Sequence, residues 1–272
     1  MHSREIPSTG IALPVVGVGT YVGFDVEPGG ADYRQLQEVL SALFAAGGSV
    51  IDSSPMYGRA EAVAGQLLAE SGERERAFLA TKVWVRGKPA GIAQMEESFE
   101  LLRAKTIDLM QVHNLLDWQT HLPVLRQWQA QGRFRHIGVS HYTPSAYPEL
   151  EKVLRAERLD FLQVNYSAQD REAEQRILPL AAERGIAVLV NMPFGGGGLL
   201  RSLRGKPLPS WADEWGCSSW AQLLLKYVLG HAAVTCVIPG TGNPRHMREN
   251  AAAGSGLVLD EGQRRKVREA LS

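Results

Sequence analysis

Residues 48–58 read GSVIDSSPMYG, a short apolar run that ends in an acid and passes into a loop containing proline, tyrosine and glycine. The run Val50–Asp52 shows no alternation of apolar and polar residues, as expected of a strand that is buried on both faces. Apolar residues with helical spacing precede it at Leu36–Phe44 and stop at a pair of glycines, a typical signal for the end of a helix. The stretch therefore predicts one strand of a parallel sheet that is entered from a helix.

The same alternation of a short apolar run with a longer helix-like segment continues along the chain. Repeated β-α units predict a parallel sheet with right-handed crossovers, and eight such units close into a barrel. The length of 272 residues fits one barrel, for which about 250 residues are typical. We therefore predict an α/β protein, a (β/α)8 TIM barrel that forms a single domain over residues 1–272. The eight predicted strands are Val15–Val18, Val50–Asp52, Phe78–Lys82, Asp108–His113, His136–Ser140, Phe161–Asn165, Ala187–Asn191 and Thr235–Pro239.

Two segments depart from the bare barrel. Arg4–Pro14 precedes the first barrel strand, and we expect it to form an N-terminal hairpin that covers the bottom of the barrel. Residues 195–217 follow the seventh strand and are rich in glycine, proline and tryptophan. Connections of this length are usually functional or disordered. We therefore expect a long loop on the face where the active sites of barrels lie.

The composition argues against several classes of protein. Lys plus Arg number 29 and Asp plus Glu also number 29, so no basic excess indicates a nucleic-acid partner. No apolar run approaches the roughly 18 residues of a membrane span, and the first residues lack the apolar region of an export signal. Cys217 and Cys236 are expected to be reduced thiols. We therefore expect a cytoplasmic protein. We also expect it to be a monomer without a metal site.

The chemistry of a barrel lies at the carboxyl ends of its strands. The second, third and fourth predicted strands end in Asp52, Lys82 and His113, and Tyr57 lies in the loop that follows Asp52. Each residue alone is most simply a turn, rim or structural residue, but four ionisable groups on three adjacent strand ends are hard to explain by chance. An ammonium stabilises a phenolate, so Lys82 would lower the pKa of Tyr57 and make it a general acid toward a carbonyl oxygen. Asp52 would hold Lys82, His113 would orient the substrate, and a cofactor would supply the hydride.

Seven segments in chain order carry a further signal: Gly48–Gly58, Thr81–Trp84, Val112–His113, Gly138–Ser140, Gln163–Tyr166, Ile238–Pro244 and Glu249–Asn250. Together they resemble the aldo-keto reductase family over almost the whole chain, and the most specific parts are the first segment and the final stretch from Ile238–Pro244 through Glu249–Asn250. The resemblance implies that Asp52, Tyr57, Lys82 and His113 are a complete catalytic tetrad. It also implies an NADP-dependent oxidoreductase that reduces aldehydes or ketones to alcohols by hydride transfer, with Tyr57 as the general acid.

The cofactor site is expected at the end of the barrel formed by the last strands. No G-x-G-x-x-G stands between a strand and a helix, so a Rossmann site is not expected. Barrels bind phosphate after strands seven and eight, where a helix N-terminus faces the anion. With the contacts that the resemblance implies, the residues assigned to the cofactor are Gly19, Thr20, Tyr21, Asp52, Ser140, His141, Gln163, Asn191, Met192, Pro193, Phe194, Pro239, Gly240, Thr241, Gly242, His246, Glu249 and Asn250.

Several of these positions differ from the usual pattern of the family. His141 stands where an Asn usually follows the Ser, and Asn191 stands where many members stack a Tyr on the nicotinamide. Gly240 and His246 replace the Lys and Arg that often hold the extra phosphate of NADP. Arg245 and Arg248 are expected to compensate, because Arg suits phosphate. We therefore expect NADPH as the cofactor, with NADH as the alternative and with a reduced preference between them.

The substrate is expected to be a small carbonyl compound in an aromatic pocket made by Tyr21, Trp84 and Trp118. Trp211 is equally well explained as a residue that packs a loop. Two other functions fit the same residues. Lys82 at a strand end suits a Schiff-base lyase or aldolase. Some proteins that are similar to aldo-keto reductases are instead non-catalytic regulatory subunits that sense the cofactor.

Overall fold

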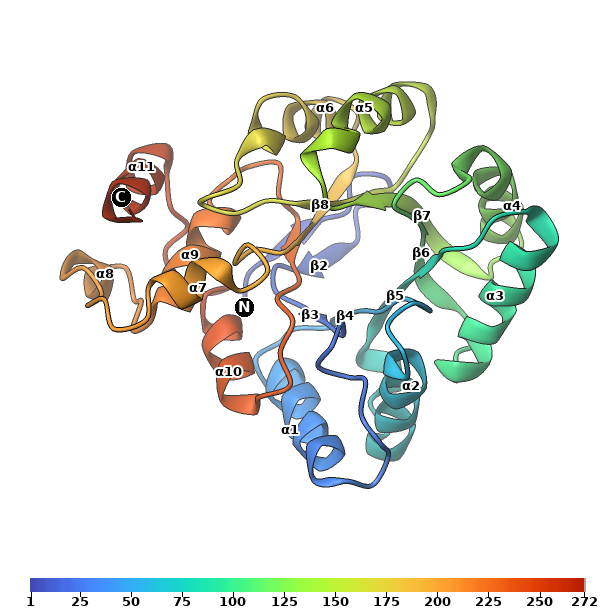
Figure 1. Ribbon diagram of the computed structural model, residues 1–272, viewed down its shortest axis with the longest axis horizontal. Helices are drawn as coiled ribbons and strands as arrows, with labels where there is room; N and C mark the ends of the chain where they lie inside the picture. Colours follow the sequence, from blue (N-terminus) through green and yellow to red (C-terminus); the bar gives the residue numbers. More distant parts are fainter. Residues whose placement is uncertain (272) are drawn as a thin grey trace.

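The computed structural model describes residues 1–271 and shows eight parallel strands in a nearly closed barrel (Figure 1). Neighbouring strands follow one another in chain order, so each new β-α unit adds a strand beside the previous one. The barrel strands are β3 (Val18–Gly19), β4 (Val50–Asp52), β5 (Phe78–Val83), β6 (Ile107–His113), β7 (Phe134–His141), β8 (Phe161–Asn165), β9 (Ala187–Asn191) and β10 (Cys236–Val237). The predicted (β/α)8 architecture is confirmed.

The first and last barrel strands are shorter than predicted. They meet through two isolated bridges, Val16 with Val237 and Gly19 with Gly240, and not through a continuous ladder. Val15 still pairs with this edge, because its carbonyl accepts from the Val237 N–H at 2.9 Å. A Cβ on Gly19 would lie 2.9 Å from the Ile238 carbonyl oxygen. The close approach that joins the two edges therefore requires a residue without a side chain at this position.

Helices pack around the outside of the barrel (Figure 1). They are α1 (Ala31–Ala45), α2 (Ala60–Ser71), α3 (Lys88–Leu101), α4 (Trp118–Ala130), α5 (Tyr147–Ala156), α6 (Ile177–Glu183), α9 (Trp220–Leu229), α10 (Pro244–Ala252) and α11 (Glu261–Leu271), with short 3₁₀ turns η1 (Arg74–Arg76), η2 (Pro144–Ala146) and η3 (Glu172–Glu174). Within residues 1–271 no helix is both long enough and apolar enough to cross a membrane.

The bottom of the barrel is covered by the predicted hairpin, formed by β1 (Ser3–Glu5) and β2 (Ala12–Pro14). Ile6 and Leu13 of this hairpin are buried and join the apolar residues inside the barrel. Their partners there are Val50, Ala80, Leu109, Phe161, Ala187, Leu189, Cys236 and Ile238. The barrel interior is therefore packed at this end, and access is left to the opposite end.

The two cysteines are unpaired, as predicted, and both are buried. Cys236 lies inside the barrel, where burial raises the pKa of its thiol. A buried thiol with a raised pKa is a poor nucleophile, so Cys236 acts as a small apolar residue of the core.

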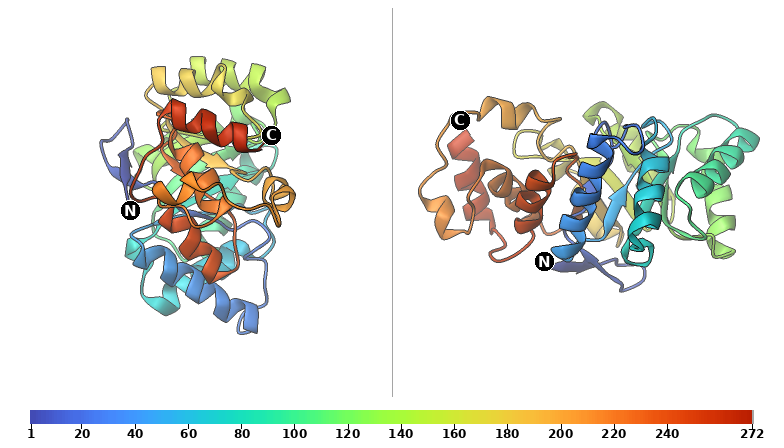
Figure 2. Two further views of the ribbon diagram at one scale, coloured as in Figure 1. Left: turned by 90° about the vertical axis from the view of Figure 1, so that its left-hand side faces the viewer. Right: turned by 90° about the horizontal axis from the view of Figure 1, so that it is seen from below.

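The segment after β9 differs from the prediction of a long loop. Residues 195–217 contain two short helices, α7 (Gly198–Ser202) and α8 (Trp211–Glu214). Leu199, Leu203 and Ala212 are buried in the main core, and this anchoring explains why the segment is ordered. The segment and the N-terminal hairpin lie at opposite ends of the barrel (Figure 2).

Backbone strain is concentrated at the end of the barrel that carries the carboxyl ends of the strands. Six non-glycine residues have positive φ angles, and five of them lie in loops that follow β3, β6 and β9. These five are Val22, Asn114, Leu115, Asp117 and Met192. A left-handed conformation in such residues costs about 1–3 kcal/mol each and is common at functional sites.

Replacement of Ile6 by Ala is expected to destabilise the protein by about 2–5 kcal/mol, because it leaves a cavity at the bottom of the barrel. The matched control is Ile11→Ala in the same hairpin, whose side chain is 49% exposed. It should change the free energy of unfolding by less than about 0.5 kcal/mol. Urea denaturation of both variants tests this, and equal effects would contradict the role given to Ile6.

Candidate active site

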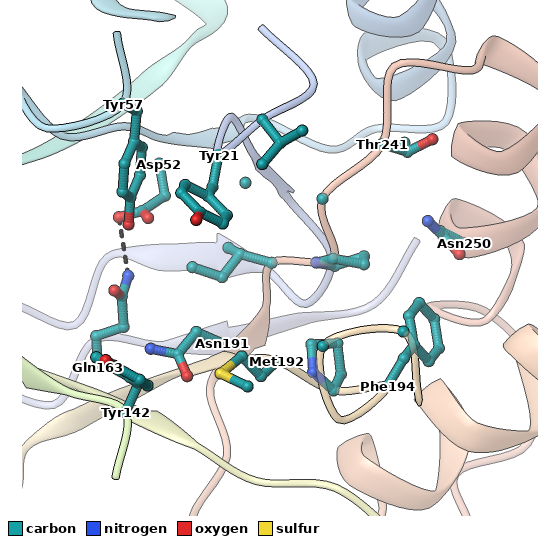
Figure 3. A pocket seen from close by; sticks show the side chains of 18 of the residues that line it. Tyr21, Asp52, Tyr57, Tyr142, Gln163, Asn191, Met192, Phe194, Thr241 and Asn250 are labelled. Carbon is teal, nitrogen blue, oxygen red and sulfur yellow. Dashed lines mark hydrogen bonds between the residues drawn. The ribbon is translucent and has the colours of Figure 1, made fainter. Parts of the chain in front are cut away.

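A cavity of about 950 Å³ opens at the carboxyl ends of the barrel strands. Its walls come from the loops after β3, β4, β5, β6, β7, β9 and β10 and from the starts of α7, α9 and α10. In Figure 3, Tyr21, Asp52 and Tyr57 lie at one end of this cavity, and Thr241 and Asn250 lie at the other. The cavity is therefore an elongated site, with Asp52 and Tyr57 at one end and residues of α10, among them His246 and Glu249, at the other.

A buried ion pair lies beneath the first end. Lys82 Nζ donates to Asp52 Oδ2 at 2.7 Å and to the Ser53 carbonyl oxygen at 2.7 Å. The other carboxylate oxygen, Asp52 Oδ1, accepts from Gln163 Nε2 at 2.8 Å (Figure 3) and from Gln111 Nε2 at 3.3 Å. The Lys82 side chain is completely buried, so this charge survives only because it is paired and hydrogen-bonded.

Tyr57 lies directly against this ion pair. Lys82 Nζ is 5.1 Å from the centre of the Tyr57 ring and interacts with the Tyr57 hydroxyl. Burial raises the pKa of Tyr57, and the Lys82 ammonium opposes this rise only in part. The expectation of a lowered pKa is therefore wrong in its net direction, because desolvation outweighs the attraction of the ammonium. The pKa of Lys82 is raised by Asp52 and Tyr57 despite burial, so the lysine stays charged.

His113 completes the group and is held in a neutral state. Burial, reinforced by the charge of Lys82, lowers the pKa of His113 to about 2. Its Nδ1 lies 3.0 Å from the Ser54 hydroxyl oxygen. Its ring lies between Tyr57 and Trp84, with ring centres 6.0 Å and 6.2 Å away. A neutral imidazole in this position can form a hydrogen bond to a ligand without carrying charge.

Most residues assigned from the sequence line this one cavity. Besides Asp52, Tyr57 and His113, these are Gly19, Tyr21, Trp84, Ser140, Gln163, Asn191, Met192, Pro193, Phe194, Pro239, Gly240, Thr241, His246, Glu249 and Asn250. Residues from all parts of the chain are thus brought together at one end of the barrel. Their roles toward a ligand stay predictions.

Five assigned residues do not line the cavity, and one of them is Lys82, which lies buried beneath it. Thr20 is fully buried, and its hydroxyl donates to Ser53 Oγ at 2.9 Å. His141 turns its Nδ1 toward the backbone N–H groups of the loop that follows it. Gly242 lies beyond the cavity wall, and Trp118 packs against the core at the start of α4. The structure therefore does not bring Trp118 to the cavity with Tyr21 and Trp84.

Other cavity residues were not recognised in the sequence. Asn114 and Tyr142 come one residue after β6 and β7, so the rule that found His113 extends to them. Ile238 likewise comes one residue after β10, whereas the residues of α7, of α9 and of the turns before them have no signal of this kind, because these helices were not placed over the barrel. The unrecognised residues are Val22, Met56, Asn114, Tyr142, Gly196, Gly197, Leu200, Ser219, Trp220, Ala221 and Ile238.

Unpartnered polar atoms in the cavity fit a nicotinamide cofactor. Ser140 Oγ and Asn191 Oδ1 are buried and have no hydrogen-bond partner among the described residues. Such atoms require a partner, and a carboxamide group offers both a donor and an acceptor. At the other end, Thr241 lies in the loop that leads into the N-terminus of α10, a site that suits phosphate.

One cationic candidate among the residues of α10 faces the cavity. His246 lines it, whereas Arg245 Nε donates to Glu249 Oε1 at 3.1 Å. Arg248 lies beside Glu38 in a separate depression between α1 and α10. The expectation that Arg248 compensates for the missing cations is therefore wrong, because it projects from another side of the helix.

Comparison with known proteins shows the family. The model of the aldo/keto reductase family matches residues 15–272. The chain belongs to the aldo/keto reductase family. The resemblance seen in the sequence is confirmed, and with it an NAD(P)H-dependent oxidoreductase that acts on carbonyl groups.

Known aldo-keto reductases are similar over nearly their whole length. Methylglyoxal reductase YeaE of Escherichia coli is 30% identical over 93% of this chain and 89% of its own. The NADH-specific methylglyoxal reductase of Escherichia coli is 25% identical over 92% of this chain and 93% of its own. The crystal structure of an aldo/keto reductase from Klebsiella pneumoniae in complex with NADP and acetate is 26% identical, with a TM-score of 0.83, over 100% of this chain and 96% of that chain.

The pKa shift of His113 gives a test of the site. Because burial and Lys82 lower the pKa of His113 to about 2, its ring should stay neutral from about pH 4 to pH 9. Its ring proton resonances in NMR spectra should not shift over this range, and a His113→Asn variant would assign them. A titration between about pH 5 and pH 7 would contradict the burial that the structure shows.

Proposed function

We propose that this aldo-keto reductase reduces small aldehydes and ketones to alcohols, with Tyr57 delivering the proton to the carbonyl oxygen. One observation carries the proposal. The Tyr57 hydroxyl lies at a cavity wall beside a buried ammonium that Asp52 holds at 2.7 Å. Nicotinamide bound in the same cavity supplies the hydride.

The electrostatics of Tyr57 suit a proton donor. Because burial raises the pKa of Tyr57, the phenol keeps its proton at neutral pH. When a carbonyl oxygen gains negative charge and takes this proton, the phenolate that remains lies against the Lys82 ammonium. Asp52 fixes the position of that ammonium, and the Gln163 and Gln111 side chains fix Asp52. His113, which is neutral, binds and orients the same oxygen.

The large apolar and aromatic side chains around the cavity opening favour uncharged substrates. Tyr21, Trp84 and Tyr142 are each at least 39% exposed, and Met56 and Met192 lie beside the same opening. Large exposed apolar side chains around a cavity are typical of a ligand site. Because two similar proteins bear the name methylglyoxal reductase, we propose small 2-oxoaldehydes as the first substrates to test.

The structure speaks against the Schiff-base alternative. Lys82 is fully buried, does not line the cavity and has a raised pKa, so its amine is neither neutral nor accessible to a substrate carbonyl. Borohydride treatment in the presence of substrate should therefore leave Lys82 unmodified. The alternative of a non-catalytic regulatory subunit predicts cofactor binding with no turnover.

We also propose that the protein is cytoplasmic, where its two unpaired cysteines would stay reduced, and that it is a monomer. Gel filtration with light scattering tests the oligomeric state against the chain mass of 29.8 kDa. A mass twice that value would contradict it.

Replacement of Tyr57 by Phe is expected to lower kcat for carbonyl reduction by about 10²–10⁴-fold, the usual contribution of a general acid. Binding of NADPH, followed by quenching of tryptophan fluorescence, should stay within about threefold of the wild type, because the ring is retained. Tyr142→Phe removes another hydroxyl from the cavity and should cost far less. Near-normal turnover of Tyr57→Phe would refute the assignment.

Replacement of His246 by Arg is expected to tighten NADPH binding by about tenfold, because a guanidinium stays charged and binds phosphate through two hydrogen bonds. The wild type should prefer NADPH to NADH by a modest margin only, because Gly240 supplies no charge and His246 stands where family members often carry an Arg. Titration of both cofactors against the wild type and the variant tests this, with Arg248→Gln as the control on another side of α10. An outright preference of the wild type for NADH would show that this loop does not bind the 2′-phosphate.

A further inference from the structure

Ser54 contacts two residues of the site and has no role in the chemistry described so far. It follows β4 by two residues and is fully buried. Its hydroxyl oxygen lies 3.0 Å from His113 Nδ1. Its carbonyl oxygen accepts from the Tyr57 N–H at 3.0 Å. One residue thus holds the ring of His113 and the backbone of Tyr57 at the same time.

The direction of the hydrogen bond to His113 follows from the proton of the Ser54 hydroxyl. A buried hydroxyl proton needs an acceptor, and His113 Nδ1 is the partner that this hydroxyl has among the described residues. If Nδ1 carried the proton of the imidazole, the hydroxyl proton would be buried without an acceptor, at a cost of about 1–3 kcal/mol. The hydroxyl therefore donates and Nδ1 accepts.

A neutral imidazole carries a single proton, and the hydrogen bond at one nitrogen decides which nitrogen holds it. We propose that Ser54 is a positioning residue that keeps the proton of His113 on Nε2, so that His113 presents an N–H donor to the cavity. His113 lines the cavity, and Nε2 is the ring nitrogen that Ser54 leaves free.

This tautomer matters for the proposed carbonyl reduction, on which the catalytic part of the inference rests. A donor at Nε2 attracts the carbonyl oxygen and grows stronger as negative charge develops there. A lone pair at Nε2 would repel the same oxygen. Ser54 also accepts a hydrogen bond from the Tyr57 backbone N–H. The same residue therefore helps to position both side chains that would contact the carbonyl oxygen, His113 and Tyr57.

The first experiment measures the tautomer directly and does not depend on turnover. Nitrogen-15 NMR of the wild-type protein, with histidines labelled, distinguishes a protonated ring nitrogen from an unprotonated one. We expect the protonated nitrogen of His113 to be Nε2. A proton on Nδ1 would overturn the inference whatever the enzyme reduces, whereas a proton on Nε2 in a protein without reductase activity would overturn only the proposed function.

The second experiment separates positioning from support of the fold. Ser54→Ala should lower kcat for aldehyde reduction by about tenfold, the effect of one lost hydrogen bond, and should leave NADPH affinity unchanged. Ser54→Thr keeps the hydroxyl and should recover most of the lost rate. Ser71→Ala is the matched control, because it removes a serine hydroxyl that bonds to Leu68 at the far end of α2.

The outcomes are distinct. A Ser54→Ala protein with wild-type kcat and a single Nε2–H tautomer would overturn the inference. Equal losses in Ser54→Ala and Ser54→Thr would show that the shape of residue 54 matters and not its hydroxyl, which also overturns it. Loss of rate together with a mixture of tautomers in Ser54→Ala, and recovery in Ser54→Thr, would support it. If Ser54→Ala fails to fold, the wild-type NMR measurement still decides.

Discussion

The buried attraction between Lys82 and Asp52 is the interaction on which the rest of the site depends. An ammonium inside a barrel loses its hydration, and only a paired carboxylate with further hydrogen bonds makes this tolerable. Asp52 meets this need because Gln111 and Gln163 donate to its second oxygen, at 3.3 Å and 2.8 Å. The pair and its two amides come from β4, β5, β6 and β8. The chemistry of Tyr57 therefore rests on strands from across the barrel and not on its own loop.

The sequence predicted the barrel and the ionisable groups because both follow from short-range rules. A parallel strand buried on both faces is an uninterrupted apolar run, and the residue that ends it lies at the carboxyl end of the barrel, as Asp52 and His113 do, while Lys82 lies one residue before the end of β5. The predictions that failed depend on contacts between distant segments. Trp118 was assigned to the pocket, but it packs against the core at the start of α4, and the sequence does not show how that helix packs. Residues 195–217 were predicted as a loop, but they contain two short helices, and Leu199 and Leu203 are buried against the barrel. The pKa of Tyr57 was misjudged because burial is a property of the fold.

The two ends of the barrel differ in packing and in backbone conformation. At the bottom, Ile6 and Leu13 fill the interior with apolar side chains in relaxed hairpin geometry. At the top, Val22, Asn114 and Met192 adopt left-handed backbone conformations that favour glycine. Strain of this kind persists only where the surrounding structure overdetermines it. The non-glycine residues with positive φ in the loops after β3, β6 and β9 therefore lie at the end of the barrel that carries the cavity.

The closure of the barrel has a consequence for the molecule as a whole. The chain's first and last barrel strands touch through two isolated bridges, and Gly19, Pro239 and Gly240 at this junction also line the cavity. A ligand that fills the cavity therefore spans the seam where the ring of strands is most sparsely hydrogen-bonded. A ligand that binds only the folded state stabilises that state. Binding in the cavity is therefore expected to stabilise the junction between the first and last barrel strands.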